Sequence, residues 1–166
     1  MNETIILKQQ LWIFLFTLLA QMFSISLSFF LGKRQARIKY YDEVKEKRYL
    51  ALYVPYIRSL YMGSAAVTSM EFCTFETSQI FLEILEENIH FMGKKSLSDY
   101  QHFYRAHLDL LEHEDGNQDF VSAPVIYQKI FIRITTSILE EALELSTQLK
   151  MPPIAQPLLS KFYAQK

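Results

Sequence analysis

An uncharged apolar run of 21 residues, Leu11 to Leu31, constrains this chain more than any other feature of its sequence. At a rise of about 1.5 Å per residue, a helix of this length is about 30 Å long and matches the hydrocarbon core of a bilayer. A cleaved signal peptide usually has an apolar region of about 7 to 15 residues, with a basic segment before it and small residues at the cleavage site. Only Lys8 precedes this run, and no such cleavage pattern follows it. We therefore expect a transmembrane helix over residues 11–32 that acts as an uncleaved signal anchor, in preference to a signal peptide or a buried globular helix.

The basic residues beside the run predict its orientation. Four of them follow it closely: Lys33, Arg34, Arg37 and Lys39. Because cytoplasmic flanks carry the excess of lysine and arginine, the C-terminal side is expected in the cytoplasm and residues 1–10 outside. The single cysteine, Cys73, agrees weakly, since it cannot form an intramolecular disulfide. The sequence thus predicts a single-pass protein of the cell membrane.

Charge is distributed unevenly along the rest of the chain. Residues 33–48 hold seven basic and three acidic side chains, whereas residues 49–166 hold nine basic and fourteen acidic ones. A basic block beside the membrane is attracted to anionic lipid head groups. A nucleic-acid binder would need a basic face on its folded domain, and the acidic remainder argues against one. The lipid bilayer is therefore an expected partner, and nucleic acid is not.

Apolar side chains recur at helical spacing throughout this remainder, with no alternating pattern typical of strands. The expected helices lie at residues 33–54, 74–92, 96–113 and 124–150. Pro55 should end or kink the first of them, a basic juxtamembrane helix, and Gly93 should stop the second. The last has two apolar faces, which predicts a central position, and a short C-terminal tail follows it. The fold class is therefore all-α: a single transmembrane helix followed by a small cytoplasmic helical bundle over residues 55–166.

Chemistry-bearing motifs are scarce. The sequence has no phosphate-binding glycine loop, no zinc-protease motif, no paired cysteines and no nucleophile elbow, so we expect no catalytic residue, metal or cofactor. His107 and Glu141 fall on apolar stripes, where a buried polar group needs a partner. They could pair with each other, or Glu141 with an arginine, as structural groups; alternatively they form a proton-transfer or metal-binding pair. Within the acidic segment 112–119, residues 115–119 resemble the start of a calcium loop, but Phe120 and Ile126 stand where the required glycine and glutamate should be, which favours a solvated turn.

Polar side chains form a seam along the predicted transmembrane helix. Its members recur at spacings of four, three and four: Thr17, Gln21, Ser24 and Ser28. They fall within about 60° on one face, while Ser26 points nearly opposite. Lipid offers these groups no partners, so we expect this face to bind a second transmembrane helix, either a copy or a partner's. The alternative is an isolated helix whose hydroxyls bond to their own backbone.

These features support two interpretations of function. The favoured one is a noncatalytic interaction module, an adaptor or regulator held at the membrane, where tethering raises its local concentration for a membrane-associated partner. The alternative is a small membrane-bound enzyme that uses His107, Glu141 or the acidic segment 112–119. A closed core around the two side chains would favour the first, and an open pocket in which they converge would favour the second.

Overall fold

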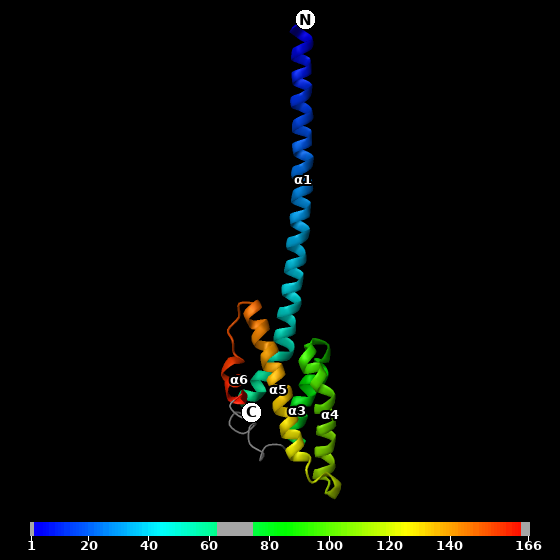
Figure 1. The fold of residues 1–166 in the computed structure, drawn as a ribbon, viewed down its shortest axis with the longest axis vertical. Coiled ribbons are helices and arrows are strands. Elements are labelled where there is room, and N and C mark those ends of the chain that lie inside the picture. Colours follow the sequence, from blue (N-terminus) through cyan, green and yellow to red (C-terminus); the bar gives the residue numbers. More distant parts are fainter. Residues whose placement is uncertain (1, 63–74, 164–166) are drawn as a thin grey trace. The chain divides into compact units, whose positions relative to one another are not determined.

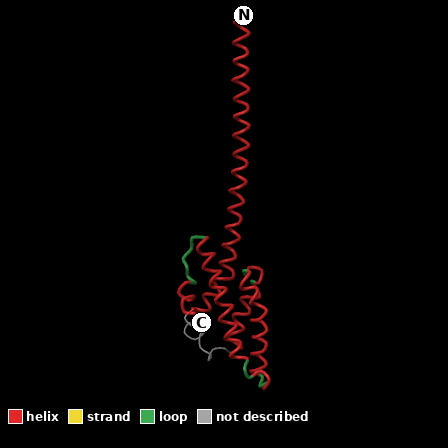
Figure 2. The backbone as a smooth tube through the Cα atoms, in the orientation of Figure 1, coloured by secondary structure: helices red, strands yellow, loops and turns green. Residues whose placement is uncertain are grey.

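The computed structural model of the chain describes residues 2–62 and 75–163. Within these ranges the backbone forms helices joined by short loops and no strand, as Figure 2 shows, which confirms the all-helical class. Cys73 and the stretch from Gly63 to Met70 lie outside the described residues. The chain divides into two compact units, Met1–Glu43 and Val44–Lys166, and we call the second the helical unit.

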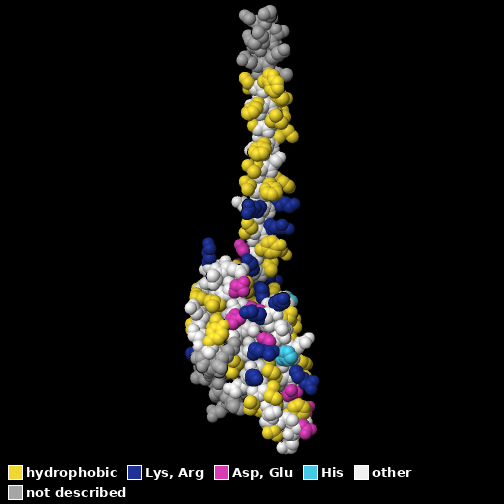
Figure 3. All heavy atoms as spheres, in the orientation of Figure 1, with side chains coloured by type: hydrophobic (Ala, Val, Ile, Leu, Met, Phe, Trp, Pro, Cys, Tyr) yellow, Lys and Arg dark blue, Asp and Glu magenta, His cyan; other side chains and the backbone are white. Residues whose placement is uncertain are grey.

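The first unit belongs to helix α1, Asn2–Arg48. From Trp12 onward its side chains are exposed, including Trp12 at 70% and Phe16 at 76%. Figure 3 shows hydrophobic side chains covering this part of the helix. The core helix of a soluble protein would be mostly buried, but none of the apolar window here is buried by the described residues. The described residues therefore include one N-terminal helix that is long and apolar enough to cross a membrane.

Pro55 does not end the helical path as expected. After α1 the backbone forms a π-helix, η1 (Tyr49–Tyr53), and then helix α2 (Val54–Met62). Pro55 has no N–H to donate, and in a regular α-helix its ring would crowd the carbonyl of Ala51. In the wider turn the Val54 N–H donates to the Tyr49 carbonyl, five residues back, so the path continues past the proline.

This continuation changes the expected boundary of the juxtamembrane helix. Its buried positions recur at helical spacing on one face: Tyr49, Leu52, Tyr53, Tyr56, Ile57 and Leu60. The segment from Val44 onward belongs to the helical unit, whereas the sequence places residues up to 54 before the bundle. Tyr49, Tyr53 and Tyr56 are therefore core residues of the unit, with the Tyr56 hydroxyl 2.8 Å from Thr135 Oγ1, whereas Tyr61 is exposed.

The remaining elements pack around one long helix. They are α3 (Phe75–Glu87), η3 (Ile89–Phe91), α4 (Lys94–Glu114), η4 (Gln118–Phe120), α5 (Ala123–Gln148) and α6 (Gln156–Tyr163). Helix α5 packs against α4, α6 and η1, and Figure 1 shows α6 beside it. It buries side chains along its whole length, from Tyr127 to Ser146. The C-terminal tail is packed, since Leu158, Leu159 and Phe162 of α6 are buried.

Two helix ends differ from the sequence prediction. Helix α3 ends at Glu87 rather than at Met92, and the Asn88 amide donates to the Ile84 carbonyl at 3.0 Å. This side chain satisfies a carbonyl that the end of a helix leaves open. Gly93 then precedes α4 as its N-cap instead of stopping α3. The turn between the two helices brings the start of α4 to the buried side of α5.

Candidate functional site

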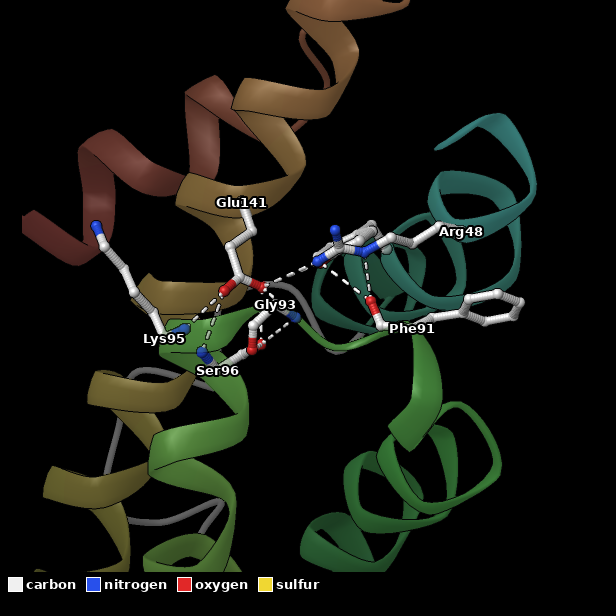
Figure 4. A network of polar contacts seen from close by, with 7 residues as sticks. Arg48, Phe91, Gly93, Lys95, Ser96 and Glu141 are labelled. Atoms are coloured by element: carbon white, nitrogen blue, oxygen red, sulfur yellow. Dashed lines mark hydrogen bonds and ion pairs between the residues drawn. The ribbon is translucent and has the colours of Figure 1, made fainter. Parts of the chain in front are cut away.

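The Glu141 carboxylate, on α5, caps the start of α4 (Figure 4). Its Oε2 accepts from the Gly93 N–H at 3.0 Å and from Ser96 Oγ at 2.7 Å. Its Oε1 accepts from the backbone N–H groups of Lys95 at 3.1 Å and Ser96 at 3.2 Å. The first N–H groups of a helix have no partner inside it and carry partial positive charge, so a carboxylate is a favourable cap. Here the cap comes from another helix, 45 residues along the chain.

The same carboxylate is joined to the end of α1 and to η1. Tyr53 Oη donates to Glu141 Oε2 at 3.0 Å, and Arg48 Nη2 lies 3.9 Å from that oxygen. Arg48 also donates from Nη2 to Tyr53 Oη at 2.6 Å and from Nε to the Phe91 carbonyl. Figure 4 shows the Arg48 and Glu141 side chains pointing toward each other between the helices. We call the residues Arg48, Tyr53, Gly93, Lys95, Ser96 and Glu141 the Glu141 cluster.

Electrostatics keep the phenol of Tyr53 in its donating form. Burial, and after it the adjacent Glu141 carboxylate, hold the pKa of Tyr53 well above its ordinary range. An ordinary tyrosine is already protonated at neutral pH, and this shift makes ionisation of the phenol less favourable still, so it donates to the carboxylate. The guanidinium of Arg48 supplies the compensating positive charge.

Gly93 leaves space for the Glu141 carboxylate and has no unusual backbone angle. Its φ of −80° is accessible to any residue. A Cβ added there would overlap the Glu141 carboxylate, well inside van der Waals contact. A larger residue would therefore displace the carboxylate from the start of α4.

The bonding of Glu141 decides what this cluster can do chemically. A carboxylate offers about four lone-pair positions, and here five hydrogen bonds and an ion pair reach its two oxygens. No acceptor position remains for a substrate proton or a metal ion. A surface depression of about 330 Å³ opens onto the cluster, and its lining includes Arg48, Gly93, Lys95 and Glu141. The rest of the lining carries both charges, among them the exposed Lys94 and Glu144. The contacts of Glu141 therefore hold α5, the start of α4 and the segment Arg48–Tyr53 together.

His107, on α4, is buried as its position on the apolar stripe indicates, and it contacts α3. Its Nδ1 lies 2.7 Å from Ser78 Oγ, and both side chains are buried. Burial lowers the pKa of His107, which favours the neutral imidazole. His107 is not among the hydrogen-bond or ion-pair partners of Glu141, so the structure does not bring the two candidates together. The other expected partner of Glu141, an arginine from another helix, is found as Arg48.

The acidic segment 112–119 covers the end of α4, the turn after it and the start of η4. The Asn117 amide donates to Glu112 at 3.1 Å, the Asp119 N–H donates to Asn117 Oδ1 at 3.1 Å, and Gly116 has a φ of +86°. These are contacts of an exposed turn. Among the described residues, no three histidine, cysteine, aspartate or glutamate side chains gather where they could hold a metal ion.

The polar and basic residues that the sequence singles out on α1 differ in whether the helix itself supplies them with a hydrogen-bond or ion-pair partner. Thr17 Oγ1 lies within hydrogen-bond distance of the carbonyls of Ile13 (3.0 Å) and Phe14 (2.8 Å), its own backbone. Gln21, Ser24 and Ser28 are exposed and make no side-chain hydrogen bond to the described residues. Lys39 Nζ lies 3.9 Å from Glu43 Oε1, whereas Lys33, Arg34 and Arg37 have no ionic partner in the described part of the chain.

Sequence reasoning missed most of the Glu141 cluster and the Ser78 partner of His107. The position of Glu141 on an apolar stripe signals a partner, and Arg48 was a candidate only as one of several arginines. Tyr53 is 88 residues from Glu141, and Gly93 is 48 residues away. Local spacing carries no information about such long-range pairs.

Comparison of the chain with family models, with curated proteins and with solved structures finds no match to any of them.

Proposed function

We propose that this protein is a membrane-anchored, noncatalytic helical module, an adaptor or regulator that acts on a membrane-associated partner. In this proposal α1 crosses the cell membrane once, with residues 1–10 outside and the helical unit in the cytoplasm. The observation that carries it is the apolar window of α1, none of which is buried by the described residues. Apolar surface left in water costs about 25 cal/mol per Å², so lipid or another protein must cover these side chains.

The candidate chemical groups support a noncatalytic role. A general base needs a free lone pair within reach of a substrate proton. The oxygens of Glu141 are occupied by the start of α4, Tyr53 and Arg48, and His107 is buried against Ser78. These contacts hold the helices of the unit together. A fixed arrangement of helices suits a surface that binds a partner.

Within the membrane we propose that the seam on α1 binds a second transmembrane helix, either a copy or a partner's. Thr17 contributes least in this proposal, because its hydroxyl is already within bonding distance of its own backbone. Gln21 contributes most, because its amide carries donors and acceptors that lipid cannot satisfy. Ser24 and Ser28 let the second backbone approach closely.

Extraction with alkaline carbonate tests the anchor. The wild-type chain should stay with the membrane pellet, and a Leu19→Arg, Phe23→Arg variant should move to the supernatant, because each arginine near the centre of a span costs about 2.5 to 3.5 kcal/mol. Leu19→Ala with Phe23→Ala is the matched control and should stay in the pellet. Recovery of the wild type in the supernatant would contradict membrane anchoring.

Affinity purification from mild detergent tests the interaction. A partner protein whose binding requires the membrane anchor should co-purify with the wild-type chain and with the alanine control, but not with the arginine variant. If the arginine variant recovers the same proteins in equal amounts, the anchor has no part in partner binding and the module proposal fails in this form.

A further inference from the structure

The part of α1 that follows the apolar window has two chemically different faces. At about 100° per residue, Phe29, Phe30, Lys33, Arg34 and Arg37 fall within about 140° of the helix circumference, and we call this set the basic-aromatic face. Lys39, Asp42 and Glu43 lie on the opposite side. Figure 3 shows lysine and arginine side chains directly after the hydrophobic stretch of the helix.

We propose that the basic-aromatic face binds anionic phospholipid, with acyl chains against the two phenylalanines and the head-group phosphate at the three cations. The inference rests on the proposed membrane anchoring and names the class of lipid that the anchor selects. These five residues line a groove of about 470 Å³ on the first unit. Along the groove the lining changes from aromatic rings to cations, in the order of a phospholipid tail and its phosphate.

The charges of this face are available to a ligand. Lys33, Arg34 and Arg37 form no ion pair or hydrogen bond with the described residues, whereas Lys39 on the other side is paired with Glu43. Guanidinium groups bind phosphate oxygens through two parallel hydrogen bonds, and a neighbouring ammonium adds charge. The face therefore carries three uncompensated positive charges.

Two tyrosines extend the same face by one turn. Tyr40 and Tyr41 are 63% and 53% exposed, with ring centroids 6.0 Å apart. Tyrosine is enriched where the head groups of a bilayer meet water, because its ring is apolar and its hydroxyl is polar. Their place after the cations fits a segment that leaves the bilayer through the head-group layer.

The seam lies on the other side of the helix from this face. Gln21, Ser24 and Ser28 fall about 180° from the centre of the basic-aromatic face. Lipid and a second transmembrane helix can therefore occupy α1 together. The apolar rings favour a phospholipid over a soluble anion, since free phosphate has no group to cover them.

Lipid selectivity of the full chain in phosphatidylcholine bilayers tests the proposal. Spin-labelled phosphatidylglycerol and spin-labelled phosphatidylcholine are added in trace amounts, and the ratio of their association constants with the protein is measured. The wild type should prefer phosphatidylglycerol, by up to about five-fold for each cation in contact, and high salt should reduce the preference. Lys33→Gln, Arg34→Gln, Arg37→Gln combined should bring the ratio to parity.

Lys39→Gln is the single-charge control, compared with Arg37→Gln, which removes the same charge from the proposed face. The Arg37 variant should lose selectivity and the Lys39 variant should keep it. Equal selectivity in the triple variant and the wild type, or equal losses from the two single variants, would overturn the proposal. Carbonate extraction of each variant separates this outcome from failure of membrane anchoring, because the protein must stay in the pellet for the lipid measurement to apply.

Discussion

At the scale of single residues, Glu141 shows how one carboxylate can fix the ends of separate elements. It receives the first N–H groups of α4 and the phenol of Tyr53, and it faces Arg48. Its side chain is 11% exposed, so water cannot replace these contacts fully. Removing the charge leaves buried donors and a guanidinium without their acceptor, which costs more than an exposed ion pair is worth.

Glu141→Gln should therefore lower the free energy of unfolding by about 2 to 4 kcal/mol. The amide keeps one acceptor oxygen but turns an NH₂ group toward the N–H groups of α4. Thermal unfolding of the full chain in detergent, followed by near-ultraviolet circular dichroism, measures the change. Glu144→Gln, three residues on and exposed, is the control and should stay within about 0.5 kcal/mol of the wild type. Equal effects of the two variants would contradict the role of Glu141 as a cap.

Gly93→Ala tests the contact from the other side. An added Cβ would overlap the Glu141 carboxylate, which must then leave its donors on α4. The substitution should destabilise the wild type but have little effect in a Glu141→Ala background, where the carboxylate is absent. The double-mutant cycle should give a coupling of about 1 to 3 kcal/mol between the two sites. Simple additivity would show that Gly93 serves another purpose.

His107 predicts a dependence of stability on pH. The unfolded chain binds a proton at histidine near pH 6.5, whereas burial lowers the pKa of His107 in the folded protein. Just below about pH 6.5 the unfolded state therefore binds more protons, so this histidine makes the free energy of unfolding fall as the pH falls, by at most about 1.4 kcal/mol per pH unit. The loss ends once the folded form is also protonated.

Unfolding measured between neutral and mildly acidic pH checks this expectation. The wild type should lose stability more steeply on acidification than His107→Gln, which cannot be protonated. His102→Gln, at an exposed position of the same helix, should keep the wild-type slope. A wild-type slope in the His107 variant would mean that other groups cause the acid sensitivity.

At the scale of elements, the sequence predicts a helix well where the spacing of apolar residues marks it. It predicts poorly how the chain passes from one helix to the next. The stripe of α5 predicts a helix over 124–150, and the structure has it over Ala123–Gln148. Pro55 was expected to end or kink a helix, yet the π turn before it keeps the helical path and buries Tyr53 and Tyr56. Proline is unfavourable in an α-helix. The residues around Pro55 do not by themselves reveal that a π turn before it will accommodate the proline. The choice depends on the core that these tyrosines fill.

The seam on α1 makes a prediction for this element alone. In a membrane two-hybrid assay, Gln21→Leu with Ser24→Leu should weaken association, because both replaced groups face the proposed second helix. Ser26→Leu, nearly opposite, should not weaken it. Thr17→Val should have less effect than Gln21→Leu, since Thr17 is already bonded within α1. Equal signals from all of these constructs would exclude the seam as the contact.

At the scale of the whole molecule, the strongest signals in the sequence are those that act over short distances. The uncharged run predicts a membrane-length apolar helix, and apolar spacing predicts the other helices, because both depend on neighbours within a few turns. The Glu141 cluster and the Ser78–His107 pair join residues 29 to 93 positions apart, and they follow only from how the helices pack. His107 and Glu141 were each expected to need a partner. Which partner each one takes could not be read from their spacing.

The orientation of the molecule in the membrane gives the last prediction. Four basic residues follow the apolar window, and three of them have no partner in the described part of the chain. Because no group there offsets these positive charges, the positive-inside rule and the anionic leaflet both favour the cytoplasmic side for them. We therefore expect a cysteine at Asn2 to react with an impermeant thiol reagent in intact cells. A cysteine at Glu114, the exposed last residue of α4, or at Asn117, in the exposed turn that follows, should react only after the cells are opened. Cys73→Ser removes the native thiol, and that variant without an added cysteine measures the background. The reverse pattern, with the turn labelled and position 2 protected in intact cells, would place the helical unit outside and overturn the assigned orientation.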